Sequence, residues 1–170
     1  MKIRILGCGG SFGSPLAWEK NGNIDIKNIN NFRTRSSILI TDEETNLLID
    51  TSPDLRQQLY KAKCTKIDAC LFTHIHSDHT SGLPDMRAIS LINNKIIPAY
   101  MPIEMQEEIL SNYKFIFSGD KGYKPFMKIQ NLENNLNIGN FKIETFKHNH
   151  GFIDAQTFRI GNFAYSTDIK

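Results

Sequence analysis

A histidine-rich segment directly after a short apolar run constrains this chain more than any other feature. Residues 73–79 read Thr-His-Ile-His-Ser-Asp-His and hold three of the five histidines of the chain within six positions. The preceding run, residues 69–73, has the length and apolar character of a short buried strand. Chance gives three imidazoles and a carboxylate at this spacing in about one chain in several thousand. We therefore interpret the segment as a metal-binding turn at the end of a strand.

The spacing within this segment suits divalent cations. Imidazole and carboxylate groups are the usual ligands of zinc and manganese. Residues two apart in an extended chain face the same side, so His74 and His76 can bind one ion together. Asp78 and His79 follow where the chain turns toward a helix, and they can reach a second ion about 3.5–4 Å from the first. We predict one or two ions per chain, Zn or Mn.

Composition limits the classes of protein to consider. A length of 170 residues is typical of one domain, and we expect a single domain over residues 1–170. Apolar residues make up 40% of the chain and charged residues 22%, which is typical of a globular protein. The net charge of +2 does not indicate a nucleic-acid partner. There is no apolar run long enough for a membrane span, and three scattered cysteines favour the cytoplasm.

The remaining pattern predicts alternating strands and helices, then mostly strands. A glycine-rich loop at residues 7–13 and a long loop at 14–34 separate the first strand from a hairpin. The predicted strands are 2–6, 36–41, 45–50, 69–73, 96–101, 141–147, 155–160 and 163–166, and the predicted helices are 53–62, with Ser52 as its N-cap, 84–92 and 102–113. Residues 114–137 carry no clear pattern. This order indicates a layered α/β domain.

The motif at residues 73–79 resembles the metal-binding signature of the metallo-β-lactamase-fold hydrolases. The resemblance reaches nearly the whole chain, through residues 3–11 (IRILGCGGS), 33–37 (RTRSS), 48–56 (LIDTSPDLR), 150–151 (HG) and 164–168 (AYSTD). Together these segments are similar to the branch that contains the phosphonate-pathway cyclic phosphodiesterase. The resemblance implies an αββα sandwich, of which this chain carries the N-terminal portion, with the second half incomplete.

The resemblance also implies a ligand set. One ion would bind His74, His76 and His150, the other would bind Asp78 and His79, and Asp168 would bridge the two. His150 is preferred to His148 because a glycine follows it, as in the family, although His148 could compete from an extended strand. Asp50 matches an aspartate that orients a ligand histidine; its alternative is a turn residue ahead of a helix.

Family members continue past the bridging aspartate and supply later histidines, one a ligand of the second ion and one that assists the leaving group. This sequence ends two residues after Asp168, and no histidine follows His150. We therefore expect a complete first site, a weaker second site and apolar surface that a second copy or a partner chain could cover.

The implied activity is that of a metal-dependent hydrolase, a phosphodiesterase acting on a small substrate. A metal-activated hydroxide would attack phosphorus, with Asp78 handling the proton. Arg33 and Arg35 are candidates for phosphate contact, or else solvated loop arginines.

Three alternatives differ in class. A non-catalytic remnant would bind only metal or a partner polypeptide. A diiron flavoprotein would carry an acidic residue in place of His76, which argues against that class. Lactam hydrolysis is disfavoured by the phosphodiesterase-like flanking segments.

Overall fold

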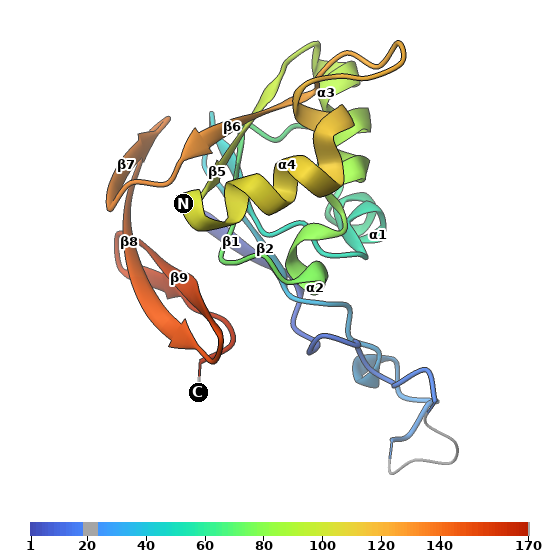
Figure 1. Cartoon of the computed structure of the whole chain (residues 1–170). Coiled ribbons are helices and arrows are strands. Elements are labelled where there is room, and N and C mark those ends of the chain that lie inside the picture. Colours follow the sequence, from blue (N-terminus) through green and yellow to red (C-terminus); the bar gives the residue numbers. More distant parts are fainter. Residues whose placement is uncertain (19–23, 170) are drawn as a thin grey trace.

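The computed structural model describes residues 1–18 and 24–169, which form three layers (Figure 1). Helices cover one face of a six-stranded sheet, and a four-stranded sheet packs on its other face. The first sheet has the order β1-β2-β3-β4-β5-β6 and the second the order β10-β9-β8-β7. This arrangement confirms the predicted layered α/β fold. Within the described residues, no helix covers the outer face of the four-stranded sheet (Figure 1).

Strands and helices are interleaved along the chain up to residue 117, and the elements after that residue are strands. The strands are β1 (Lys2–Gly7), β2 (Ser37–Thr41), β3 (Asn46–Ile49), β4 (Ala69–Leu71), β5 (Ile97–Met101), β6 (Met127–Asn131), β7 (Asn135–Ile138), β8 (Phe141–His150), β9 (Ile153–Ile160) and β10 (Phe163–Tyr165). The α-helices are α1 (Leu55–Ala62), α2 (Ser77–Thr80), α3 (Met86–Asn93) and α4 (Ile103–Phe117), and the 3₁₀ turns are η1 (Ile29–Asn31) and η2 (Leu83–Asp85).

Two hydrophobic cores hold the layers together, and the alternation along single strands supplies both. On β2, Ile38 and Ile40 face the four-stranded sheet, whereas Leu39 faces the helices. Successive side chains of a strand point to opposite faces, so a strand between two layers must be apolar on both. This explains why the buried runs of β2, β3 and β4 are almost continuously apolar.

The pairing changes from antiparallel to parallel across the first sheet. β1, β2 and β3 pair antiparallel, and β3, β4, β5 and β6 pair parallel. The carboxyl ends of parallel strands lie at one edge of a sheet, where ligand sites of open α/β sheets gather. The histidine-rich segment begins at this edge, two residues after β4 ends.

Most predicted elements agree with the structure, and the differences have local causes. Helix α1 begins at Leu55 and not at residue 53, because residues 53–54 form a turn and Asp54 directly precedes the helix. The Ser52 hydroxyl accepts from the Asp54 N–H, as a capping serine does, and donates to Gln58. Residues 114–137, which carried no clear pattern, hold the end of α4, all of β6 and most of β7. No described helix has the length and apolar character needed to cross a membrane.

The Asp68 carboxylate joins three separate segments next to β4. It accepts a hydrogen bond from the Asn46 N–H and forms ion pairs with Lys66 and Lys95 at 3.1 and 3.2 Å. Burial raises the pKa of Asp68, but these three donors outweigh it and hold the pKa below its ordinary value of 3.8. A depressed pKa in the folded state stabilises the fold above the unfolded-state pKa, and this contribution is lost as the pH falls through the folded value.

We expect Asp68→Asn to lower the free energy of unfolding by about 1 kcal/mol at pH 7, as for loss of a charge-assisted hydrogen bond. The deficit should shrink toward zero below the ordinary pKa of 3.8. Urea unfolding at pH 7 and in acid measures both values. Asp120→Asn, in an exposed turn, is the control and should leave stability unchanged at both pH values. An equal deficit at both pH values for Asp68→Asn would contradict this account.

Candidate metal centre

The candidate centre lies where the carboxyl edge of the first sheet meets the end of the second. Asp50 follows β3, and the segment Thr73–His79 follows β4 and runs into α2. From the second sheet, His150 ends β8 and Asp168 follows β10. The His150 Nδ1 atom lies 2.9 Å from the Asp168 carbonyl oxygen, which brings the two late residues together. Residues nearly a hundred positions apart therefore meet at one point.

Two groups of donor atoms converge there, and His74 belongs to both. The first is His74, His76 and His150, and the second is His74, His79 and Asp168; within each group the donor atoms lie within 4.8 Å of one another. The His74 Nε2 atom is 3.0 Å from His76 Nδ1 and 3.4 Å from an Asp168 carboxylate oxygen. The two groups thus form one continuous cluster.

The second group also includes Asp78. The His79 Nε2 atom lies 3.1 Å from the Asp168 carboxylate and 3.3 Å from that of Asp78. All six residues expected as ligands therefore lie together in the structure. Their role as ligands stays a prediction.

The buried Asp50 carboxylate contacts this cluster from the interior of the protein. It accepts hydrogen bonds from the Thr73 N–H and the Thr73 hydroxyl, both at 2.8 Å, and pairs with His79 Nδ1 at 2.7 Å. Asp50 adopts a left-handed backbone conformation, with φ of 60°, which asparagine and aspartate tolerate better than other residues with a Cβ. These contacts match the orienting role that the resemblance implies for Asp50.

The hydrogen-bond directions leave the Nε2 atoms of three histidines facing the cluster. Thr73 has one hydroxyl proton; if it donates this to Asp50, it accepts from the Nδ1–H of His74, 3.0 Å away. In the same way, His79 Nδ1 faces Asp50 and His150 Nδ1 faces a backbone carbonyl. Nδ1–H groups tied outward fix the ring orientations that metal-ligating histidines need.

His148, the alternative to His150, makes different contacts. Its Nε2 atom lies 3.0 Å from the Thr167 carbonyl oxygen, and its Nδ1 atom lies 3.2 Å from the Thr157 hydroxyl. Both ring nitrogens thus have partners outside the cluster. The two-residue offset along β8 would put both histidines on one side of an ideal strand, but the contacts favour His150 as the ligand.

The charges in the cluster are set by burial and by neighbouring groups. Burial, with the nearby charge of His79, lowers the pKa of His74 to about 4, so this ring is neutral at pH 7. Burial lowers the pKa of His79 as well, but the Asp50 and Asp78 carboxylates outweigh it and raise the pKa to about 10. Burial raises the pKa of Asp78, whereas hydrogen bonding and charge from His79 lower it to about 2.

Two residues near the centre were not predicted from the sequence. Thr73 links Asp50 to His74, and its signal was its place directly before the first histidine. Ser11 contributes a side-chain hydrogen bond that lowers the pKa of Asp78. The glycine-rich loop thus contacts the donor cluster at Asp78. The spacing of residues in the sequence did not predict this contact.

The two arginines expected near the substrate lie outside the donor cluster. The Arg35 guanidinium pairs with Asp54 at 3.0 Å, and Asp54 also accepts from the Arg35 N–H. An Arg33 Nη atom lies 3.2 Å from the Cys8 sulfur, beside the glycine-rich loop. A substrate contact for either arginine stays a prediction, and the charge of Arg35 is already paired.

The donor chemistry fits a divalent cation. Four imidazoles and two carboxylates approach one another from both sheets, and such His-plus-carboxylate sets suit zinc, manganese and similar ions. The His74 Nε2 and His76 Nδ1 atoms lie 3.0 Å apart, which is close enough for one cation to bind both.

Comparison with known proteins identifies the family. Residues 45–170 match the model of the beta-lactamase superfamily domain, and the chain belongs to this family. A crystal structure described as a new diphosphatase from the PhnP family superposes with a TM-score of 0.86 at 26% identity, covering 96% of this chain and 63% of that one. The Zn(2+)-bound PqqB from Methylobacterium extorquens superposes with a TM-score of 0.68 at 19% identity, covering 95% and 60%. These likenesses confirm the metallo-β-lactamase-like fold.

A curated relative carries a different name. The chain is 30% identical over 174 residues to an octanoyltransferase of Porphyromonas gingivalis, a match that covers all of this chain and 35% of that protein. The chain therefore spans about a third of this relative and less than two thirds of the two structures above.

We expect His150→Gln to weaken zinc and manganese binding by at least about 10–100-fold. Loss of a residue that only orients a metal ligand already has an effect of this size. The reason is that the His150 Nε2 atom faces the cluster while Nδ1 is held by Asp168. Isothermal titration calorimetry of the purified chain measures the affinity. His148→Gln is the matched control, two residues away on the same strand, and should stay near the parent value. A larger loss of metal affinity in His148→Gln than in His150→Gln would identify His148 as the ligand.

We expect Asp50→Asn to reduce metal affinity about 10–100-fold, the usual effect of losing a group that orients a ligand histidine. Asparagine keeps the size and tolerates the left-handed backbone, so the substitution mainly alters the contacts to His79 and Thr73. Titration calorimetry again measures the effect. Asp68→Asn removes a carboxylate far from the cluster and should lower stability without changing metal affinity. Equal affinity in all three proteins would contradict an orienting role for Asp50.

Proposed function

We propose that this chain forms the metal centre of a metal-dependent hydrolase whose substrate is a small phosphodiester. The observation that carries the proposal is the convergence of four histidines and two aspartates, drawn from both sheets, on one cluster. The fold family supports hydrolysis, and the structural neighbour named as a diphosphatase favours phosphorus over a lactam as the site of attack.

In this proposal His74, His76 and His150 hold one cation, Asp78 and His79 hold a second, and Asp168 is shared. The name of the zinc-bound structural neighbour supports zinc, and manganese fits the same donors. A divalent cation bound by these groups supplies Lewis acidity, which lowers the pKa of water and stabilises negative charge on phosphoryl oxygens.

The protein's own groups would position the reactants. Asp50 fixes His79 and, through Thr73, His74, so that both rings keep one orientation. Asp78 is ionised at neutral pH because its pKa is about 2. It can therefore accept a hydrogen bond from the attacking water and orient it toward phosphorus.

The positive charge of Arg33 is the better candidate for contact with the substrate phosphate. Guanidinium groups match phosphate geometry. Within residues 1–18 and 24–169, Arg33 forms no ion pair with a carboxylate, whereas Arg35 is paired with Asp54. Arg33 also lies beside the glycine-rich loop, whose Ser11 reaches Asp78. A cytoplasmic location is part of the proposal, supported by three free cysteines.

The name octanoyltransferase would suggest acyl transfer, but the matched part is 35% of that protein. The function in that name can therefore belong to the part of the relative that this chain does not match. The His and Asp cluster described here is the chemistry of a metal site, and it favours hydrolysis.

The test is turnover of methyl 4-nitrophenyl phosphate by the purified chain with zinc or manganese, with metal content measured in parallel. We expect metal-dependent release of nitrophenolate and a loss of about two orders of magnitude or more in His76→Ala, since the cation supplies the main stabilisation of charge. His148→Gln should retain activity. Stoichiometric metal with no turnover that depends on His76 would favour the non-catalytic alternative.

A further inference from the structure

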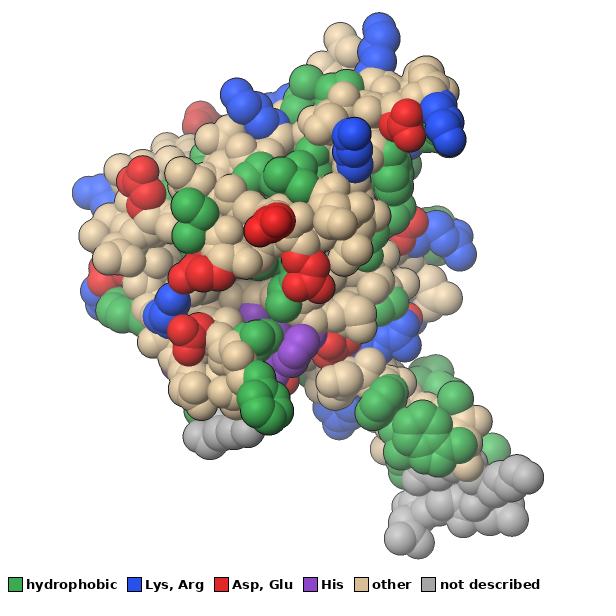
Figure 2. Space-filling view, in the orientation of Figure 1, with side chains coloured by type: hydrophobic (Ala, Val, Ile, Leu, Met, Phe, Trp, Pro, Cys, Tyr) green, Lys and Arg blue, Asp and Glu red, His purple; other side chains and the backbone are tan. Residues whose placement is uncertain are grey.

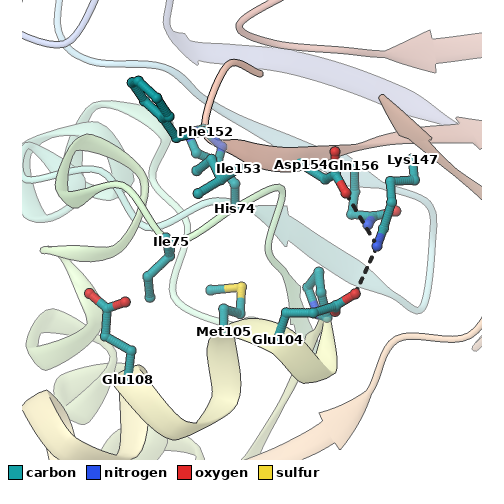
Figure 3. Close-up of a pocket in the computed structure, with 11 residues that line it drawn as sticks. His74, Ile75, Glu104, Met105, Glu108, Lys147, Phe152, Ile153, Asp154 and Gln156 are labelled. Atoms are coloured by element: carbon teal, nitrogen blue, oxygen red, sulfur yellow. Dashed lines mark hydrogen bonds and ion pairs between the residues drawn. The ribbon is translucent and has the colours of Figure 1, made fainter. Parts of the chain in front are cut away.

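A pocket of about 310 Å³ opens directly beside the cluster of His and Asp donor groups, and His74 forms part of its wall. It lies between the start of α4 and the β8–β9 hairpin (Figure 3). Figure 2 shows acidic side chains gathered beside the hollow in which histidine reaches the surface. The volume is at the lower end of the range for small-ligand pockets, about 300–1,000 Å³. It therefore suits one compact group.

Apolar side chains form part of the inner surface of the pocket. Ile75 and Met105 form one side, and Ile153 lies opposite, close to His74 (Figure 3). Phe152 stands at the mouth, and its side chain is fully exposed. Contact with an apolar ligand would remove part of this exposed aromatic surface from water, which favours binding.

Ion pairs join the two walls at one end. The Lys147 ammonium on β8 lies 2.7 Å from Glu104 on α4 and 3.5 Å from Asp154 on β9 (Figure 3). The backbone also fixes this wall, because the Gln156 N–H donates to the Thr73 carbonyl at 2.9 Å. The ion pairs and this backbone hydrogen bond therefore hold the pocket walls at a set distance from each other and from the histidine-rich segment.

The charged groups of the pocket are unbalanced. Three carboxylates line it, those of Glu104, Glu108 and Asp154, against the single ammonium of Lys147. Lys147 is already engaged by two of these carboxylates. A second phosphate placed here would meet net negative charge, and the like-charge contact would oppose its binding.

We infer that this pocket binds the organic group of the substrate, and that this group is compact, uncharged and largely apolar, such as an aromatic ring. The inference rests on the proposed function, which puts the phosphodiester phosphorus at the metal cluster. The pocket then selects a diester with one phosphate, and it disfavours substrates that would place a second phosphate between α4 and the hairpin.

Binding can be tested without turnover, with phenylphosphonate, methylphosphonate and pyrophosphate as probes on the metal-loaded chain. The methyl resonance of Met105 in NMR spectra reports the pocket, and those of the buried Met86 and Met127, which do not line it, are internal controls. We expect phenylphosphonate to bind about tenfold tighter than methylphosphonate or more, because the pocket buries an apolar ring. Only Met105 should shift. Equal affinities, or no shift of Met105, would overturn the inference.

Two variants separate shape from charge. Ile153→Trp fills the pocket and should abolish the preference for phenylphosphonate while methylphosphonate still binds; Ile92→Trp, on an exposed part of α3, should preserve it. Glu108→Lys should raise the affinity for pyrophosphate relative to methylphosphonate by several-fold. A Glu108→Lys variant with unchanged selectivity would contradict the role given to the carboxylates.

The proposed function and this inference can fail separately. Neutral benzyl alcohol, titrated into the chain without added metal, reports the pocket through Met105 even if no phosphodiester is hydrolysed. A Met105 shift that Ile153→Trp removes supports the pocket whatever the hydrolysis assay gives. Hydrolysis of the methyl diester with no aromatic binding at Met105 would leave the proposed function in place and remove the pocket inference.

Discussion

The buried carboxylate of Asp50 is the contact on which the rest of this centre depends. It sits at the end of β3 and accepts from Thr73 after β4 and from His79 on α2, so it joins three segments of the chain. A buried carboxylate is costly unless all its hydrogen-bonding capacity is used. The fold satisfies this need with the same groups that orient two histidines, so stability and site geometry share one set of bonds.

The second constraint is that neither sheet holds the cluster alone. The β8–β9 pairing carries His150 to the edge of the second sheet, and Asp168 reaches the same point after β10, with a left-handed φ of 55° that turns the chain. The Thr51 N–H donates to the His79 carbonyl, and the Gln156 N–H donates to that of Thr73. These two bonds fasten α2 to the β3 end and the second sheet to the histidine segment. Packing of the sandwich is therefore the step that assembles the donors.

The pocket beside the cluster is a product of the same packing. Its walls belong to α4 and to the β8–β9 hairpin, which lie on different sheets, and Lys147 ties them together through Glu104. An exposed ion pair of this kind contributes little stability by itself. Its position matters more, since it closes one end of the pocket and leaves Glu108 and the apolar side chains to face a ligand.

The sequence alone determined the features that depend on local order. Continuous apolar runs predicted β2, β3 and β4, and the spacing of His74, His76, Asp78 and His79 predicted a metal-binding turn, because these groups are held close by a few bonds of chain.

The tertiary structure decided what depends on distant pairing. The β6 residues Met127–Asn131 show no clear alternation and form a strand because they pair with β5. The glycine after His150 already favoured it over His148 as a ligand, and the contacts of Thr157, Thr167 and Asp168 support that choice. Ser11 meets Asp78 through a loop that no periodicity describes. Such contacts follow from how two sheets pack, and packing is a property of the whole chain that no local pattern contains.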